Sequence, residues 1–270
     1  MAGGRGRVDG AAVSQLVSWQ SRSRRSSAMT PVGWSEVAPT PQIQHTTFVM
    51  KTTRNRGKLW SRFFSQERFH GNVVLNFTRF PKGELAAYGR SYHEAAQHLV
   101  KHTASTHYRD PDACPIVFLY RHAVELYLKA IIHWGNSLLQ LNGKPIAPHR
   151  NIFTEHRLRA LLKSVKPILR FQKSLSNWDD SHFRCFRDVE KVIEELEEFD
   201  PGSYSFRYPI DTTGTKGTLP HHMLFNVIAF GEEFDHLITI LSGISMMAYE
   251  DFQVQAAACH EHQQMVANGL

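Results

Sequence analysis

The stretch CPIVFLYRHAVELYLK, residues 114–129, decides how this chain folds. It is an apolar run with helical spacing that carries four ionisable side chains, Arg121, His122, Glu125 and Lys129. Moving an ionised side chain out of water costs several kcal/mol unless an opposite charge pairs with it. The stretch therefore predicts a core helix that holds either a structural ion-pair network or a binding site.

The spacing of these charges is compatible with both interpretations. Arg121 and Glu125 are one helical turn apart, as are Glu125 and Lys129, so the three charges can neutralise one another along one face. In the alternative, Arg121 and Lys129 bind a phosphate or an RNA backbone and Glu125 orients them, because arginine pairs well with planar oxyanions.

Apolar residues recur at spacings of three and four along much of the chain, which predicts an all-α, up-and-down bundle of four to five helices. The expected helices are 84–103, 115–140, 154–170, 178–199 and 219–250, followed by a C-terminal extension, 251–270. Thr154 is the expected N-cap of the third helix, and Pro167 is expected to bend or end it. Asn142-Gly143 and Asp200-Pro201-Gly202 are expected stops.

The apolar faces of the first and last helices follow from the same spacing. The first is expected to bury Leu85, Tyr88, Tyr92, Ala95, Ala96 and Leu99. The last is expected to carry Leu224, Phe225, Val227, Ile228, Phe234, Leu237, Ile238, Ile240 and Leu241 on its apolar side.

Positive charge is concentrated at the start of the chain. Residues 1–70 contain 11 Lys+Arg and 3 Asp+Glu, whereas residues 71–270 contain 20 and 22. The first 70 residues mix Gly, Ser, Arg and Pro without a helix or strand period, which predicts a disordered basic tail. Met29 and Met50 are alternative starts, and an Arg- and Ser-rich, acid-poor beginning is also typical of a transit peptide.

Composition argues against several classes of protein. No apolar run reaches the roughly 20 residues that a bilayer span requires, so no membrane contact is expected. The three cysteines are odd in number and far apart, which favours the cytoplasm over an oxidising compartment. GxxxxGK[ST], GxGxxG after a strand, GxSxG and HExxH are all missing. His221 and His222 have no carboxylate or cysteine at ligand spacing, so neither a metal nor another cofactor is expected.

Three short motifs occur in a recognisable order. The second expected helix contains AVELYLKAI, residues 123–131. The third opens with HRLRALL, residues 156–162, and the last is preceded by FRYP, residues 206–209. This order resembles the HEPN domain (higher eukaryotes and prokaryotes nucleotide-binding), whose members have an Ala–Glu–Leu–Lys–Ala helix and a His-x-Leu-x-x-Leu segment. The resemblance covers about residues 84–250.

The resemblance implies a helical domain that often forms homodimers. Family members act as metal-independent RNases of toxin or defence type, or as partners of a nucleotidyltransferase or an antitoxin. The RNase signature is Arg, four to six residues, then His, and Arg150 with His156 has this spacing, so these two are the candidate catalytic residues. The pair precedes the third helix, whereas the family's motif opens the final one. The resemblance therefore favours a regulatory, non-catalytic module that binds RNA, a nucleotide or a partner, with an RNase as the alternative.

The expected ligand-binding residues are Arg121, Glu125, Lys129, Arg207 and Asp211. All of these except Asp211 are expected to converge with His156 on one side of the bundle, where the cluster should retain the positive charge that binds phosphate. His156 is either a general acid or base, or an imidazole bonded to a carboxylate. The FRYP loop either forms part of the site or braces it, with Arg207 paired to Glu125.

Overall fold

The computed structural model describes residues 73, 80–106, 110–146, 151–175, 180–220 and 224–268 of the 270-residue chain. The predicted basic tail and the candidates Arg150, His221 and His222 lie outside the described residues. The chain divides into two compact units, of which the one containing Phe80–Leu270 holds the described helices.

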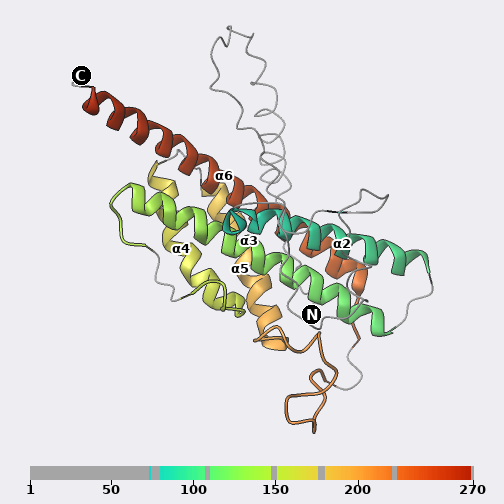
Figure 1. Cartoon of the computed structure of the whole chain (residues 1–270). Helices are drawn as coiled ribbons and strands as arrows, with labels where there is room; N and C mark the ends of the chain where they lie inside the picture. Colours follow the sequence, from blue (N-terminus) through green and yellow to red (C-terminus); the bar gives the residue numbers. More distant parts are fainter. Residues whose placement is uncertain are drawn as a thin grey trace, which may run out of the picture. The chain divides into compact units, whose positions relative to one another are not determined.

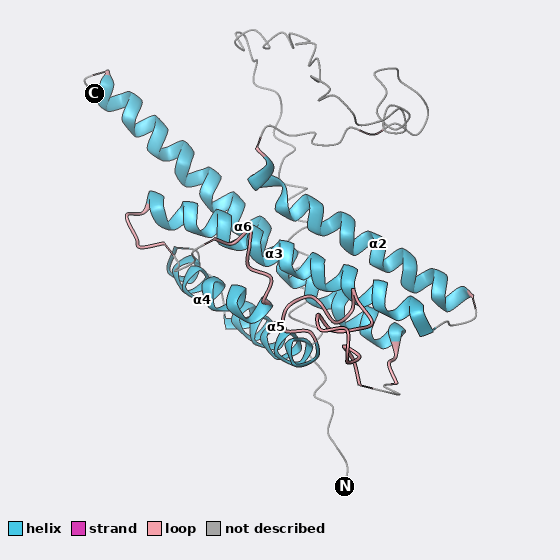
Figure 2. Ribbon diagram, turned by 60° about the horizontal axis from the view of Figure 1, so that its bottom comes forward, coloured by secondary structure: helices cyan, strands magenta, loops and turns pink. Residues whose placement is uncertain are grey.

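The described residues of this unit form five α-helices (Figure 1): α2 (Leu85–Ser105), α3 (Ala113–Leu141), α4 (Leu158–Leu175), α5 (Asp180–Phe199) and α6 (Val227–Ala267). Two short 3-10 helices, η2 (Pro81–Glu84) and η3 (Asp110–Asp112), precede α2 and α3. In the part of the chain that the structure describes, β-pairing is limited to an isolated bridge between Ile210 and Gly217. The predicted all-α class is confirmed (Figure 2).

Helix α3 is the central element of the bundle. It packs against α2, α4 and α6, and its side chains are buried on several sides, as Ile116, Val124, Leu128 and Ile131 illustrate. The expectation of a single apolar stripe on every helix is therefore wrong for α3. Three neighbouring helices cover it, so its sequence is apolar almost all round.

Helix α2 packs on α3 through small side chains and through Tyr92, whose ring lies edge-on to that of His122 with centroids 4.4 Å apart. Gly89 and Ala96 are buried, and a Cβ atom at Gly89 would lie only 3.1 Å from the ring of Tyr127. Tyr88 and Leu99 are 44% and 37% exposed, so their predicted burial is wrong. The small residues let the two helices approach closely, while Tyr88 and Leu99 lie toward solvent.

Helix α4 differs from its prediction at both ends. It begins at Leu158 rather than at residue 154, because the Glu197 carboxylate of α5 accepts a hydrogen bond from the Leu158 N–H (2.8 Å) and satisfies this otherwise free donor. Pro167 does not end the helix, which continues to Leu175. Ile168, next to the proline, is fully buried, and core burial of this kind offsets the backbone hydrogen bond that proline cannot donate.

Helix α6 begins later and ends later than predicted. The Asn226 side chain accepts a hydrogen bond from the Ala229 N–H (3.0 Å), which caps the helix at Val227. Leu224 is 98% exposed and so does not belong to the apolar side of the helix. The helix runs on to Ala267 and projects beyond α3 and α4 in Figures 1 and 2, so most of the expected C-terminal extension is its last part.

The closest described approach of α3 to α4 gives a first testable prediction. A Cβ atom at Gly135 would lie 2.2 Å from Cγ2 of the buried Ile168. We expect Gly135→Ala to lower the free energy of unfolding by about 1–3 kcal/mol, because the packed core must shift to accept the methyl group. Urea denaturation measures this. Gly202→Ala is the matched control, since no atom lies within 4 Å of its Cβ position. Equal stability of the wild type and Gly135→Ala would contradict the close contact.

Candidate functional site

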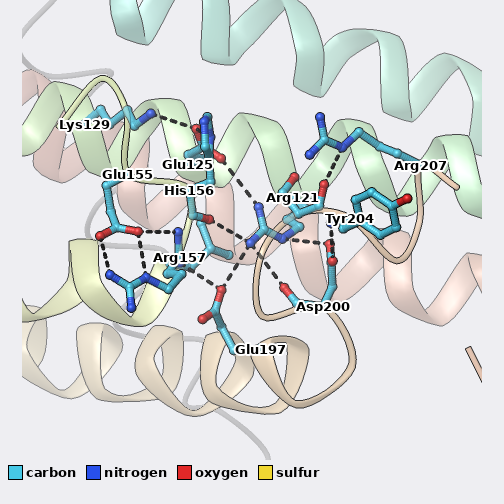
Figure 3. A network of polar contacts seen from close by, with 12 residues as sticks. Arg121, Glu125, Lys129, Glu155, His156, Arg157, Glu197, Asp200, Tyr204 and Arg207 are labelled. Carbon is cyan, nitrogen blue, oxygen red and sulfur yellow. Dashed lines mark hydrogen bonds and ion pairs between the residues drawn. The ribbon is translucent and has the colours of Figure 1, made fainter. Parts of the chain in front are cut away.

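Arg121 is fully buried in α3 and contacts three carboxylates (Figure 3). Its Nε lies 3.0 Å from Asp200 Oδ2, its Nη2 lies 3.1 Å from Glu197 Oε1, and its Nη1 lies 3.5 Å from Glu125 Oε2. Nη2 also donates to the backbone carbonyl oxygens of His156 (2.8 Å) and Asp200 (3.3 Å). The guanidinium group thus connects α3 to the turn before α4 and to the C-terminal end of α5.

Glu125 accepts hydrogen bonds from two further groups. Its Oε1 lies 2.8 Å from Lys129 Nζ and 3.0 Å from His156 Nδ1. The side chains of Glu125 and Lys129 are only 1% and 5% exposed. The prediction that Glu125 lies within salt-bridge reach of Arg121 is confirmed.

The charges of this buried network nearly cancel. Arg121 and Lys129 contribute two positive charges against the three negative charges of Glu125, Glu197 and Asp200, a sum of −1 when His156 is neutral and 0 when it is protonated. Burial raises the pKa of Glu197. The expectation that the cluster retains positive charge is therefore wrong, and Arg121 and Lys129 form the structural network that their spacing allowed.

Glu197 and Asp200 are the network members that the sequence interpretation missed. Glu197 was expected on the water-facing side of α5, yet it lies four residues after the buried Ile193 and shares its face. Asp200 was interpreted only as part of a helix stop. The register of α5 was therefore an available signal for Glu197, whereas the pairing of either residue with Arg121 depends on contacts over 76 to 79 positions.

His156 brings the network to the surface. Its side chain is 53% exposed, although its Nδ1 contacts the buried Glu125 carboxylate. A carboxylate only accepts, so this contact places a proton on Nδ1 and directs Nε2, at the opposite edge of the ring, to a ligand. The contact with Glu125 agrees with the alternative of a carboxylate-bound imidazole, whereas a role of His156 as a general acid or base stays a prediction.

The turn that holds His156 is closed by its two neighbours. Arg157 donates from Nε and Nη2 to the two carboxylate oxygens of Glu155, each at 2.9 Å, and from its backbone N–H to Oε1 at 3.0 Å. The side chain of Arg157 is the largest cause that lowers the pKa of Glu155 to about 2, from an ordinary 4.5.

This shift predicts an acid-sensitive turn. A carboxylate with a lowered pKa in the folded state stabilises the protein above its unfolded pKa, and the contribution is lost as the pH falls from 4.5 to about 2. We expect Glu155→Gln to flatten the dependence of Tm on pH within this window, as measured by circular dichroism. Arg157→Ala should flatten the same window, and the double variant should add nothing further. A Glu155→Gln protein with the wild-type dependence would contradict the assignment.

Asp200 also positions the turn that leads to Arg207. Its Oδ1 accepts hydrogen bonds from the backbone N–H groups of Tyr204 (2.6 Å) and Ser205 (2.8 Å), while its Oδ2 pairs with Arg121. Ser203, at the start of this turn, has φ 59, in the left-handed region. One carboxylate therefore links the buried guanidinium to the FRYP loop (Figure 3).

Arg207 does not pair with Glu125, so the predicted salt bridge between them is wrong. Its Nε donates to the carbonyl oxygen of Ser203, and its Cζ lies 5.8 Å from the ring centroid of Phe118 and 5.9 Å from that of Tyr208. Arg121 and Lys129 already neutralise Glu125. Arg207 remains an exposed cation that lies against aromatic rings.

Asp211 organises its own loop rather than the site. Its Oδ1 accepts hydrogen bonds from the backbone of Thr213, Thr215 and Lys216 and from the Thr213 hydroxyl. The Thr213 side chain is the largest cause that lowers the pKa of Asp211. None of these hydrogen bonds reaches α3, and the expected ligand-binding role of Asp211 stays a prediction.

One face of α3 connects these groups. Phe118, His122, Glu125 and Lys129 follow one another at spacings of four, three and four, which places them on the same side of the helix. The rings of His122 and Phe118 are stacked, with centroids 5.8 Å apart and planes at 8°. Burial is the largest cause that lowers the pKa of His122 from its ordinary 6.5, so its imidazole is neutral at neutral pH.

We name the surface formed by His156, His122, Phe118, Arg207 and Tyr208 the His156 face. It combines an imidazole and a guanidinium at the surface with aromatic rings, above a buried ionic layer. Within the described residues, no group of three or more His, Cys, Asp or Glu side chains is placed to hold a metal ion. The same residues include no helix that is long and apolar enough to cross a membrane.

Comparisons with protein-family models, with curated proteins and with solved structures gave no match.

The buried network gives a prediction about stability. Arg121→Met removes the shared partner of three buried carboxylates, and we expect it to lower the free energy of unfolding by about 3–5 kcal/mol, because the remaining charges are left unpaired. Arg90→Met, at an exposed position of α2, is the matched control and should change it by less than about 0.5 kcal/mol. Chemical denaturation of both variants measures the difference. A small effect at Arg121 would show that its carboxylate partners do not depend on it.

Proposed function

We propose that this helical unit is a HEPN-like, regulatory and non-catalytic module that binds RNA or a nucleotide through the His156 face. The observation that carries the proposal is that one buried residue, Arg121, contacts the two segments that carry the exposed side chains of His156 and Arg207. It holds the turn of His156 through a backbone carbonyl and the loop of Arg207 through Asp200. The homodimer and the nucleotidyltransferase or antitoxin partner that the resemblance implies remain predictions.

The chemistry of the His156 face suits a short stretch of RNA. Arg207 can donate hydrogen bonds to phosphate oxygens, as can Nε2 of His156 when the imidazole is protonated, and aromatic rings such as those of Phe118 and Tyr208 stack on bases of any identity. Phe118 contacts Arg207, and Glu125 contacts His156. These two positions of α3 are seven residues apart, which is about 10 Å along the helix. A short oligonucleotide can therefore contact both groups.

The buried residues act by positioning in this proposal. Arg121, Glu125 and Lys129 are at most 4% exposed and already paired, so they do not contact the ligand themselves. Their role is to keep the imidazole and the loop in place without a reorganisation cost on binding.

A metal-independent RNase is the second candidate, and the Glu125–His156 pair favours it. In a carboxylate-bound imidazole, Nε2 can accept a proton from the 2′-hydroxyl of RNA while that oxygen attacks the adjacent phosphorus; the bond from phosphorus to the 5′-oxygen of the next nucleotide then breaks, this oxygen takes a proton from water, and a 2′,3′-cyclic phosphate remains. The other predicted catalytic residue, Arg150, lies outside the described residues.

Binding of a short fluorescent RNA, followed by anisotropy, tests the proposal. We expect His156→Ala and Arg207→Ala each to weaken binding about tenfold or more, because each removes a hydrogen bond to a charged group. Arg90→Ala removes the same charge from an exposed position of α2 and should leave affinity nearly unchanged. Affinity should also fall steeply with salt.

Two outcomes would change the conclusion. Equal losses in all three variants, or no salt-dependent binding, would remove the RNA-binding role and favour a protein partner for this face. Cleavage of the RNA by the wild type but not by His156→Ala would replace the regulatory module by the RNase.

A further inference from the structure

Helix α4 carries a row of five cations on its exposed side. Arg159, Lys163, Lys166, Arg170 and Lys173 follow one another at spacings of four, three, four and three residues, and all five are exposed. At 3.6 residues per turn these positions fall within an arc of about 80°, and they extend over about 21 Å of helix. We name this row the α4 basic stripe.

The two sides of α4 differ completely in character. Its inner side buries Leu158, Leu161, Leu162, Val165, Ile168 and Leu169, and its 18 residues include no Asp or Glu. An exposed helix that is only solubilised by charge typically mixes both signs, because pairs at i and i+4 then stabilise it. The stripe instead places like charges at these spacings, an arrangement that costs stability unless a polyanion covers it.

The described lining of one pocket beside the stripe contains more cations than acids. A surface pocket of about 400 Å³ lies near the C-terminal end of α4. Its charged lining consists of Lys166, Arg170 and Lys173 from α4 and of Arg187 and Glu190 from α5. Glu190 pairs with Lys166 at 2.7 Å. Four cations and one acid give this pocket a net charge of +3.

The stripe begins close to the His156 face along the chain. Arg159 is three residues after His156 and is the second residue of α4. The cations are about 4.5–6 Å apart along the axis, a regular spacing that suits a ligand with a repeated charge. The exposed acids of α5, including Glu194 and Glu198, repel such a ligand from the neighbouring helix and confine it to α4.

We propose that the α4 basic stripe binds the sugar-phosphate backbone of single-stranded RNA and extends the His156 face into a longer track. This inference rests on the proposed function for the identity of the ligand, but the stripe uses residues that the His156 face does not. The His156 face holds one end of the strand through bases and phosphates, and α4 binds the following phosphates without regard to sequence.

The test compares two RNA lengths with two fourfold variants. The probes are a dinucleotide, and an oligouridine of about twelve nucleotides, within the range of known single-strand site sizes. The stripe variant is K163Q/K166Q/R170Q/K173Q. The control, R90Q/K101Q/K144Q/K216Q, removes the same charge from exposed positions elsewhere. Glutamine keeps helix propensity close to that of lysine and arginine, so both proteins should fold, which circular dichroism verifies.

For the oligouridine, log affinity falls as log salt concentration rises, and we expect this dependence to be less steep in the stripe variant. The magnitude of the slope should decrease by about 2.8, because four phosphate contacts are lost and each contributes about 0.7 to the slope. The stripe variant's affinity for the oligouridine should fall about tenfold or more, whereas its affinity for the dinucleotide should stay within about twofold of the wild type. The control variant should change the slope by less than about one.

Each other outcome overturns one of the two proposals separately. If the salt dependence of oligouridine affinity is the same in the stripe variant and the wild type, the stripe is a solvated surface without an RNA contact. The proposed function of the His156 face would not be affected by this result. Loss of oligouridine binding in the stripe variant but not in His156→Ala would keep the stripe and remove the proposed function of the His156 face. Competition by polyglutamate as effective as that by RNA would assign the stripe to an acidic polypeptide and overturn the RNA track.

Discussion

The described part of the bundle depends on the burial of one guanidinium group among three carboxylates. Arg121 has no exposed surface, and its partners Glu125, Glu197 and Asp200 come from α3 itself, from α5 and from the residue that follows α5. A buried ionic group of this kind contributes little net stability, because desolvation offsets most of the attraction. It does restrict the arrangement, since a shift of α5 against α3 would leave several charges unpaired in the core. Its main effect is therefore to specify how the segments fit together.

The same network gives the surface its form. Each carboxylate that neutralises Arg121 also makes a second contact that orders a different segment. Glu197 caps α4 at Leu158, Asp200 accepts the N–H groups that form the Tyr204 turn, and Glu125 holds the imidazole of His156. The buried layer and the exposed His156 face are thus two sides of one arrangement. The residues that do not touch a ligand decide where the residues that can touch it lie.

Helix α4 shows how one short sequence can serve both packing and electrostatics. Its inner leucines complete the core against α3, and its outer side carries cations at the same helical period. Because the two patterns share one period but lie on different sides of the helix, neither interferes with the other. The Glu197 cap places a carboxylate at the N-terminal end of α4, where the helix dipole also favours negative charge.

The sequence by itself determined the parts of this protein that depend on near neighbours. Spacings of three and four residues bring side chains together on one side of a helix. They account for the five helices and their approximate bounds, for the leucine face of α4 and for the Arg121–Glu125 contact. The tertiary structure decided what depends on distant segments. Glu197 and Asp200 neutralise Arg121 from 76 and 79 positions away in the sequence. Gly89 and Tyr127 set how closely α2 approaches α3. Arg207 contacts aromatic rings and not Glu125. A local pattern shows that a buried charge needs a partner, but only packing brings one segment rather than another within reach of it.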